Sequence, residues 1–412
     1  MKPYSPPSTK IAGRIIESLV GQTPEDVRIR ARKRAEYGFL ERICESLDPT
    51  QSQRERAESA YVAVGDWLAG SSALSTALVY LQGSEALGTT NKPIYGKEHD
   101  VDLICHLKGK TVDVAPSILK KIVGDRLREH GTYAPLLEEM LRCWRLNFKG
   151  EFHLDITPSI PNPSCPKGGE FVPDKKLKCW KASNPKGYLR WFLQFASFEP
   201  AFIDLNKAQE EVRAEIEAFP NKLPRKGILR RVVQLLKRHR DEWFAKDEDG
   251  LAPISIIITT LAAFAYHHCV TTYQYDNELD LLCDTIRFMP YFIEPSYVAG
   301  LFVGKVMNPT TDGENFAEKW ESDPRKAQAY REWNAAALAT FEQLSVIVGR
   351  DAIAGHLSKS LGSVVVESAV AQETEERSTA RGSGRLTIAP VVGLVANGMG
   401  TPIRANTFFG RK

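Results

Sequence analysis

The segment Asp100-Val101-Asp102, followed by the apolar run Leu103-Ile104-Cys105-His106-Leu107, decides the fold of this chain. Side chains alternate between the two faces of a strand, so Asp100 and Asp102 are predicted to point the same way. Two neighbouring carboxylates repel each other and are costly unless a cation neutralises them. The segment therefore predicts a strand that presents a cation-binding pair at its beginning.

Two further apolar runs extend this pattern. Ala77–Leu81 ends at Gln82-Gly83-Ser84, and Phe152-His153-Leu154-Asp155-Ile156-Thr157 carries a third aspartate in its middle. An unpaired carboxylate in such a run would be costly, so Asp155 needs a partner. Three carboxylates from neighbouring strands form a set of hard oxygen ligands that suits Mg²⁺. Such a set can hold two ions about 4 Å apart for in-line phosphoryl transfer.

Gly83-Ser84 adds a second element of the same chemistry. Glycine adopts backbone angles that other residues avoid and allows the backbone to approach a phosphate closely. A serine hydroxyl and neighbouring N–H groups can bind phosphate oxygens. Taken alone, the pair indicates only a turn at the end of a strand.

The rest of the chain divides into regions of different character. Residues 1–32 are a charged lead rich in proline, and residues 161–186 are predicted to be an irregular loop. Residues 373–385 lack large apolar side chains and are predicted to be a flexible linker. Strands are predicted at 77–82, 101–107, 143–149 and 152–157, and helices at 33–46, 50–70, 112–130, 187–197, 205–219, 225–245, 253–270, 276–289 and 313–348.

Composition excludes several classes of protein. The 412 residues are 43% hydrophobic and 25% charged, with a net charge of +3, which is ordinary for a globular protein and only mildly basic. The longest apolar stretch, Ile254–Tyr266, is too short to span a bilayer, and the N-terminus has no hydrophobic signal core. Seven scattered cysteines indicate reduced thiols and a cytoplasmic protein. No Walker motif, dinucleotide-binding glycine turn or serine-hydrolase elbow is present.

The combination of motifs resembles the polymerase-β-like nucleotidyltransferases. Gln82-Gly83-Ser84, Leu87-Gly88-Thr89, Asp100-x-Asp102 and Asp155 carry the resemblance. Within that superfamily the chain is most similar to the bacterial cGAS/DncV-like nucleotidyltransferases (CD-NTases) of CBASS anti-phage systems. Weaker similarity continues through Trp180–Phe192, Asn308-Pro309 and Asn315–Trp320.

The resemblance implies an α+β fold, with a nucleotidyltransferase core lobe of mixed sheet and helices at 33–200. A helical lobe at 201–360 and a linker with a tail at 361–412 would follow, and the active site would lie in the cleft between the lobes. The implied enzyme makes a cyclic di- or trinucleotide second messenger from nucleoside triphosphates: ATP, GTP or both, with pyrimidine nucleotides as further candidates. Asp100, Asp102 and Asp155 would hold two Mg²⁺ ions, for which Mn²⁺ could substitute. The phosphates would be bound by Gln82, Gly83 and Ser84, with Lys237 and Ser255 contacting the donor triphosphate.

The C-terminal tail suggests a second role through the same resemblance. Asn406-Thr407-Phe408-Phe409-Gly410 resembles the ends that ubiquitin-transfer-like partner enzymes join to a target through a glycine. Arg411-Lys412 follow Gly410, so a protease would have to remove them first. An ordinary tail packed on the surface is an equally good interpretation. The other expected partner is a downstream cyclic-nucleotide effector. We expect a monomer with no membrane partner and no obligatory DNA.

Two alternatives remain open at this point. A linear oligonucleotide synthase or RNA-modifying nucleotidyltransferase would share the three aspartates, although the chain has no long basic, aromatic-bearing RNA surface. An inactive nucleotide-sensing homologue is the other alternative, but inactive relatives usually lose a metal ligand, and all three are present. The motifs leave the bases, the 3′–5′ or 2′–5′ linkage and the ring size undetermined.

Overall fold

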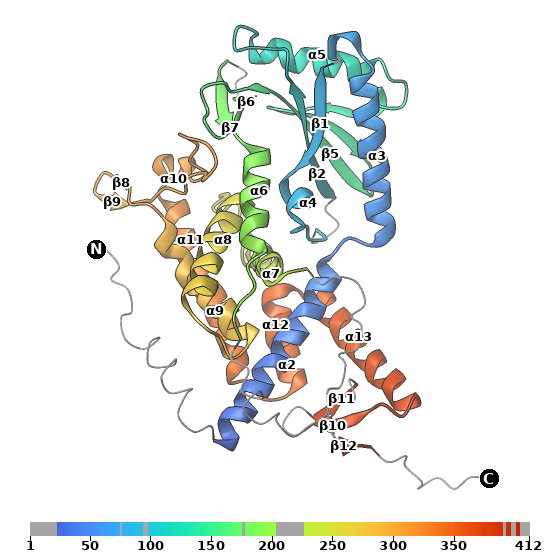
Figure 1. Cartoon of the computed structure of the whole chain (residues 1–412), viewed down its shortest axis with the longest axis vertical. Coiled ribbons are helices and arrows are strands. Elements are labelled where there is room, and N and C mark those ends of the chain that lie inside the picture. Colours follow the sequence, from blue (N-terminus) through green and yellow to red (C-terminus); the bar gives the residue numbers. More distant parts are fainter. Residues whose placement is uncertain are drawn as a thin grey trace, which may run out of the picture.

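The structure of this protein is a computed structural model of the whole chain, and it describes residues 23–74, 76–93, 98–174, 178–202, 226–389, 393–396 and 401–403. The predicted helix at 205–219 and the candidate conjugation residue Gly410 lie outside the described residues. Two bodies, one built on a sheet and one on helices, lie one above the other in Figure 1.

A mixed sheet forms the core lobe. Its strand order is β1-β2-β5-β4-β3, in which β2 and β5 are parallel and the other neighbours are antiparallel. Two further strands, β6 and β7, extend it from the end of β5. The strands are β1 (Ala77–Gln82), β2 (His99–Leu107), β3 (Leu137–Glu139), β4 (Trp144–Phe148), β5 (Phe152–Pro161), β6 (Glu170–Pro173) and β7 (Trp180–Ser183). The sequence-based prediction of a mixed sheet is confirmed.

Alternation along the strands separates a buried face from a polar one. Val101, Leu103 and Cys105 of β2 are buried in one core with the helices α3 (Gln51–Ala69) and α5 (Pro116–Arg128). The residues between them, Asp100 and Asp102, therefore belong to the other face. A capping box at Thr50 and Gln53 begins α3.

The helical lobe has its own, larger core. Its described helices are α6 (Pro185–Ala196), α7 (Ile228–Trp243), α8 (Ser255–Thr272), α9 (Glu278–Phe288), α10 (Glu318–Ser322), α11 (Arg325–Glu342), α12 (Arg350–Leu361) and α13 (Ser363–Gly382). The helix α2 (Pro24–Leu47) also packs here, against α7, α9 and α13, and continues into α3 of the core lobe (Figure 1). The short helix α4 (Gly83–Leu87) follows β1 and contacts α6.

Small elements complete the part of the chain that the structure describes. They are the 3₁₀ turns at Ser72–Leu74, Ala134–Leu136, Met289–Phe292 and Gln343–Ser345, the strand pair β8 (Tyr297–Val298) and β9 (Leu301–Phe302), and the small sheet β10 (Thr387–Ala389), β11 (Gly393–Val395) and β12 (Thr401–Pro402). Within the described ranges, no helix has both the length and the apolar character that crossing a membrane requires.

Three sequence-based predictions are wrong in part. Residues 161–186 contain the strands β6 and β7 rather than only a loop, because they pair with the end of β5. Residues 313–348 form two helices instead of one, because Pro324 precedes the second. Residues 373–382 are helical rather than linker, because Glu373 of α13 is buried and paired with Arg350 and Arg377.

The packing of buried side chains assigns residues to the two lobes differently from the predicted boundaries at residues 33, 200 and 360. Residues Tyr37–Leu47 of α2 are part of the helical core, as are Tyr188 and Phe192 of α6 and Val365 and Ala369 of α13. The long α2–α3 segment therefore links the two lobes instead of belonging to one of them.

Candidate active site

One row of residues crosses four strands of the core sheet. Asp102 of β2 lies opposite Asp155 of the parallel strand β5. On the outer sides, Gln82 of β1 pairs with Asp102, and Arg145 of β4 pairs with Asp155. The register therefore brings the predicted third carboxylate beside the Asp100–Asp102 pair, at the end of β1 where α4 begins (Figure 1).

Negative charge is incompletely compensated at Asp102. Burial raises the pKa of its carboxyl to about 6, and the neighbouring carboxylates of Asp155 and Asp100 add to this rise. Arg145 and His99 oppose the rise without cancelling it. A carboxylate in this state favours a cation as its neighbour.

Arg145 supplies such a cation from within the chain. Its Nε donates to Asp155 Oδ1 at 2.6 Å, and its Nη2 donates to Asp155 Oδ2 at 2.8 Å and to Asp100 Oδ1 at 3.2 Å. Arg145 is not among the site residues predicted from the sequence. The available signal was alternation, because Arg145 follows the buried Trp144 in β4 and so belongs to the face of the carboxylates.

The carboxylates themselves form a suitable set of hard oxygen donors for a divalent ion. In the part of the chain that the structure describes, however, no three His, Cys, Asp or Glu side chains converge as a ready-made metal cage. Asp155 is turned instead toward Arg145, which occupies both of its oxygens. A cation binding between Asp102 and Asp155 would share Asp155 with Arg145.

His153 contacts Asp100, which is the more exposed of the two carboxylates in β2. His153 Nδ1 lies 3.3 Å from Asp100 Oδ1, and its Nε2 lies 2.8 Å from Glu98 Oε2. Glu98 is anchored in turn by the backbone N–H of Gly150, at 2.6 Å from Oε1. Contacts on both ring nitrogens of His153 therefore fix the orientation of the Asp100 carboxylate. The sequence places His153 in a predicted strand, but its pattern predicts no role for this residue.

Gly83 brings the backbone against Asp102. It has a φ of +65°, and a Cβ added to it would lie only 2.4 Å from Asp102 Oδ2. Only glycine fits there without moving the carboxylate. Ser84 follows, and its Oγ accepts from Thr90 Oγ1 at 3.3 Å, while its carbonyl accepts from the N–H of Thr89 at 2.9 Å. The Gly-Ser turn and the carboxylates thus form one site.

Lys237 and Ser255 come from the helical lobe. Lys237 Nζ donates to the carbonyl of Thr89 at 2.9 Å. Burial lowers the pKa of Lys237 to about 8, and Arg240 lowers it further, while Asp241, Asp102 and Glu85 oppose this. Ser255, the first residue of α8, accepts from Arg240 Nη2 at 3.2 Å. The structure places both around Arg240; their contact with a triphosphate stays a prediction.

Comparison with known proteins finds a matching family and two relatives that are named as cyclic dinucleotide synthases. Residues 36–195 match the family described as Second Messenger Oligonucleotide or Dinucleotide Synthetase domain, SMODS. A protein of Roseivirga ehrenbergii named c-di-GMP synthase is 28% identical over 387 residues, which cover 90% of this chain and 96% of that protein. The cyclic dinucleotide synthase CdnG of Bradyrhizobium diazoefficiens is 25% identical over 62% of each chain.

Solved structures share the fold. The CD-NTase CdnG of Bradyrhizobium diazoefficiens, in complex with GTP, superposes with a TM-score of 0.60 at 20% identity, covering 81% of this chain and 98% of that one. CdnC of E. coli MS115-1 with ATP gives 0.55 at 14% identity, covering 79% and 97%. Residues 36–195 therefore carry a SMODS domain, and the chain as a whole is similar to cyclic dinucleotide synthases and shares the fold of the CD-NTases.

Proposed function

We propose that this cyclic dinucleotide synthase joins two molecules of GTP into cyclic di-GMP and releases two pyrophosphates. The choice of GTP is supported by the relative named c-di-GMP synthase, which matches 90% of this chain. The observation that carries the chemistry is the row of Asp102 and Asp155 with the backbone of Gly83 against it. This arrangement unites a cation-binding pair with a turn that suits a triphosphate.

Each step of the reaction is a nucleotidyl transfer. A ribose hydroxyl attacks the α-phosphorus of GTP, a new P–O bond forms, the bond to the β-phosphate breaks, and pyrophosphate leaves. A second transfer within the linear intermediate closes the ring. Asp100, Asp102 and Asp155 would hold two Mg²⁺ ions, or Mn²⁺ in their place. When bound, such ions activate the hydroxyl and stabilise the leaving phosphates.

The chain's own residues would orient the reactants. Gln82, Gly83 and Ser84 lie beside the carboxylates and would bind the triphosphate through backbone N–H groups and the Ser84 hydroxyl. Arg145 keeps Asp155 in place and limits the repulsion among the carboxylates. On the family resemblance, the product would signal to a downstream effector in anti-phage defence.

Product analysis tests this function. The purified full chain is incubated with each labelled nucleoside triphosphate alone and with their mixture, in Mg²⁺ or Mn²⁺, and the products are treated with phosphatase. A phosphatase-resistant product from GTP alone, with the mass of cyclic di-GMP, is the expected result. A resistant product that requires ATP would correct the substrate. A phosphatase-sensitive ladder would favour a linear synthase, and no turnover in either metal would favour the inactive sensor.

A further inference from the structure

The loop that follows Gly83-Ser84 is held by one stripe of α7 in the helical lobe. Residues spaced by four and three along a helix lie on one face. Here three such side chains each donate a hydrogen bond to a backbone carbonyl at the end of α4 or in the loop directly after it. The bonds join Arg230 to Leu87 (3.0 Å), Gln234 to Thr90 (2.8 Å) and Lys237 to Thr89 (2.9 Å).

Gln234 is the central member of this stripe and is completely buried. Its Nε2 donates both to the carbonyl of Thr90 and, at 2.7 Å, to Asp48 Oδ1. Its Oε1 accepts from Arg231 Nη1 at 3.2 Å. Because the nitrogen faces two oxygens and the oxygen faces a guanidinium, the amide has one favourable orientation.

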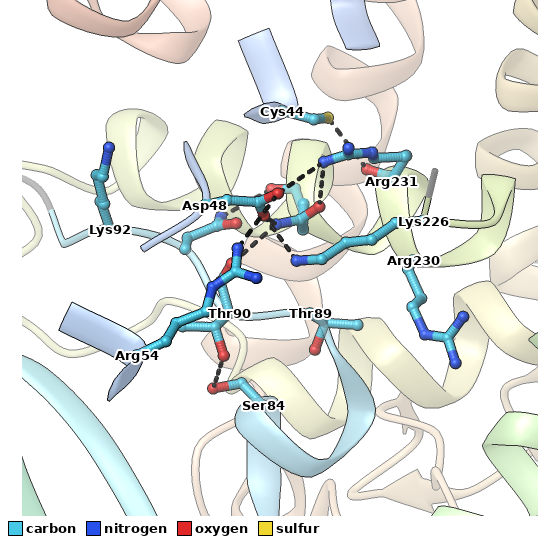
Figure 2. Close-up of polar contacts among 12 residues, drawn as sticks. Cys44, Asp48, Arg54, Ser84, Thr89, Thr90, Lys92, Lys226, Arg230 and Arg231 are labelled. Atoms are coloured by element: carbon cyan, nitrogen blue, oxygen red, sulfur yellow. Dashed lines mark hydrogen bonds and ion pairs between the residues drawn. The ribbon is translucent and has the colours of Figure 1, made fainter. Parts of the chain in front are cut away.

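Asp48 lies at the junction between the lobes. It caps the C-terminus of α2, and α3 begins three residues later. Besides Gln234, its carboxylate accepts from Lys226 at 2.6 Å and from Arg231 at 3.3 Å (Figure 2). A carboxylate held by several cations and an amide is a rigid anchor. Gln234 therefore links this anchor directly to the loop.

The connection continues to the phosphate-binding turn. Thr90 is nearly fully buried, and its Oγ1 donates to Ser84 Oγ at 3.3 Å (Figure 2). We propose that Gln234 is a positioning residue for nucleotidyl transfer, which fixes Thr90, and through it the Ser84 hydroxyl, relative to the junction at Asp48. The inference rests on the proposed function for the role of Ser84 toward the triphosphate.

Loss of the Gln234 amide should affect the binding of GTP more than the chemical step. Removing the Gln234 amide leaves the buried carbonyl of Thr90 without its donor, which is unfavourable. The loop then relaxes around Ser84, whereas the row of Asp102 and Asp155 is built on strand register and stays in place. The change should therefore raise the KM for GTP more than it lowers kcat.

The experiment compares three variants of the full chain. Gln234→Met removes the amide at similar volume, and Thr90→Val removes the hydroxyl that reaches both Ser84 and the Glu85 carboxylate. Gln328→Met, on the exposed face of α11, is the matched control. We expect each of the first two to raise the KM for GTP about tenfold, with kcat changed less than about threefold, and the control to match the wild type.

Hydrogen–deuterium exchange without nucleotide provides a readout that needs no turnover. The amides of residues 84–92 should exchange about tenfold faster in Gln234→Met than in Gln328→Met. Unchanged exchange in this loop, or an unchanged KM in both Gln234→Met and Thr90→Val, would overturn the role of Gln234. If the wild type does not convert GTP, the proposed function fails, while the exchange measurement still decides whether Gln234 orders the loop.

Discussion

Replacing Gly83 with alanine should separate backbone strain from a collision at the active site. Gly83 has a φ of +65°, and an added Cβ would lie 2.4 Å from Asp102 Oδ2. A non-glycine residue in the left-handed region costs roughly 1–2 kcal/mol. Gly250 has the same φ of +65°, but a Cβ there would meet nothing within 4 Å. Gly250→Ala is therefore a matched control that carries the strain without the collision.

The collision sets the size of the expected effect. Real Cβ atoms essentially never come within 3.0 Å of such a neighbour. The Asp102 carboxylate must therefore move by about 0.6 Å or more from its place beside Asp155. Misplacing a reacting group by about 1 Å can reduce the rate about 100-fold. We expect a loss of this order in kcat for Gly83→Ala, and an unchanged kcat for Gly250→Ala.

Two measurements on each variant test this reasoning. Formation of cyclic di-GMP at saturating GTP and Mg²⁺ gives kcat, and urea titration gives the free energy of unfolding. Both variants should lose stability by roughly 1–2 kcal/mol, because the backbone strain is the same. If Gly83→Ala keeps kcat within about threefold of Gly250→Ala, the close approach of backbone and carboxylate is not needed, and the argument is refuted.

Three further predictions concern the charges of the site. Arg56 forms an exposed ion pair with Glu151 at 3.0 Å, so Arg56→Met is a surface control. Arg145→Met should lose about 2 kcal/mol of unfolding free energy, more than Arg56→Met, and equal losses in both variants would contradict this. Mg²⁺ should raise the Tm more in Arg145→Met than in the wild type, because the ion replaces the lost cation. The folded-state pKa of Lys237, about 8, lies below that of an unfolded lysine. Between these two pKa values the unfolded chain therefore binds more protons than the folded chain, so the folded state becomes more stable as the pH rises. From pH 7 to pH 10, the free energy of unfolding of the wild type should rise by roughly 2 kcal/mol relative to that of Lys237→Met. If urea titrations show the same difference between the two proteins at both pH values, the pKa shift is disproved. Asp100→Asn combined with Asp102→Asn should abolish turnover without lowering the Tm, because the mutual repulsion is removed; full activity would exclude these residues as catalytic.

Much of the site could be predicted from the sequence because its signals are local. The alternation in β2 places Asp100 and Asp102 on one face, whatever the strand pairs with. The apolar run around Asp155 marks a buried strand with a carboxylate that needs a partner. Gly83 signals a turn that other residues would avoid. These three signals can be recognised without any tertiary contact, and together they were sufficient to suggest the family.

The rest depends on segments that are far apart in the chain. Arg145 becomes the partner of Asp155 only through the register of β4 against β5, which no single segment specifies. Gln234 meets Asp48 and Thr90 across 186 and 144 residues. Likewise, residues 373–382 contain too few apolar side chains to predict a stable helix, but the ion pairs of Glu373 with Arg350 and Arg377 help to hold α13 in place.

The sequence by itself determined which residues are the candidates for the chemistry, since a strand's alternation and a glycine's freedom are properties of a few consecutive residues. Only the tertiary structure decided what neutralises and orients those residues: a guanidinium from the next strand and an amide from the other lobe. The physical reason is that hydrogen bonds and ion pairs act over a few ångströms in space. Their partners are therefore chosen by packing and register, not by proximity along the chain.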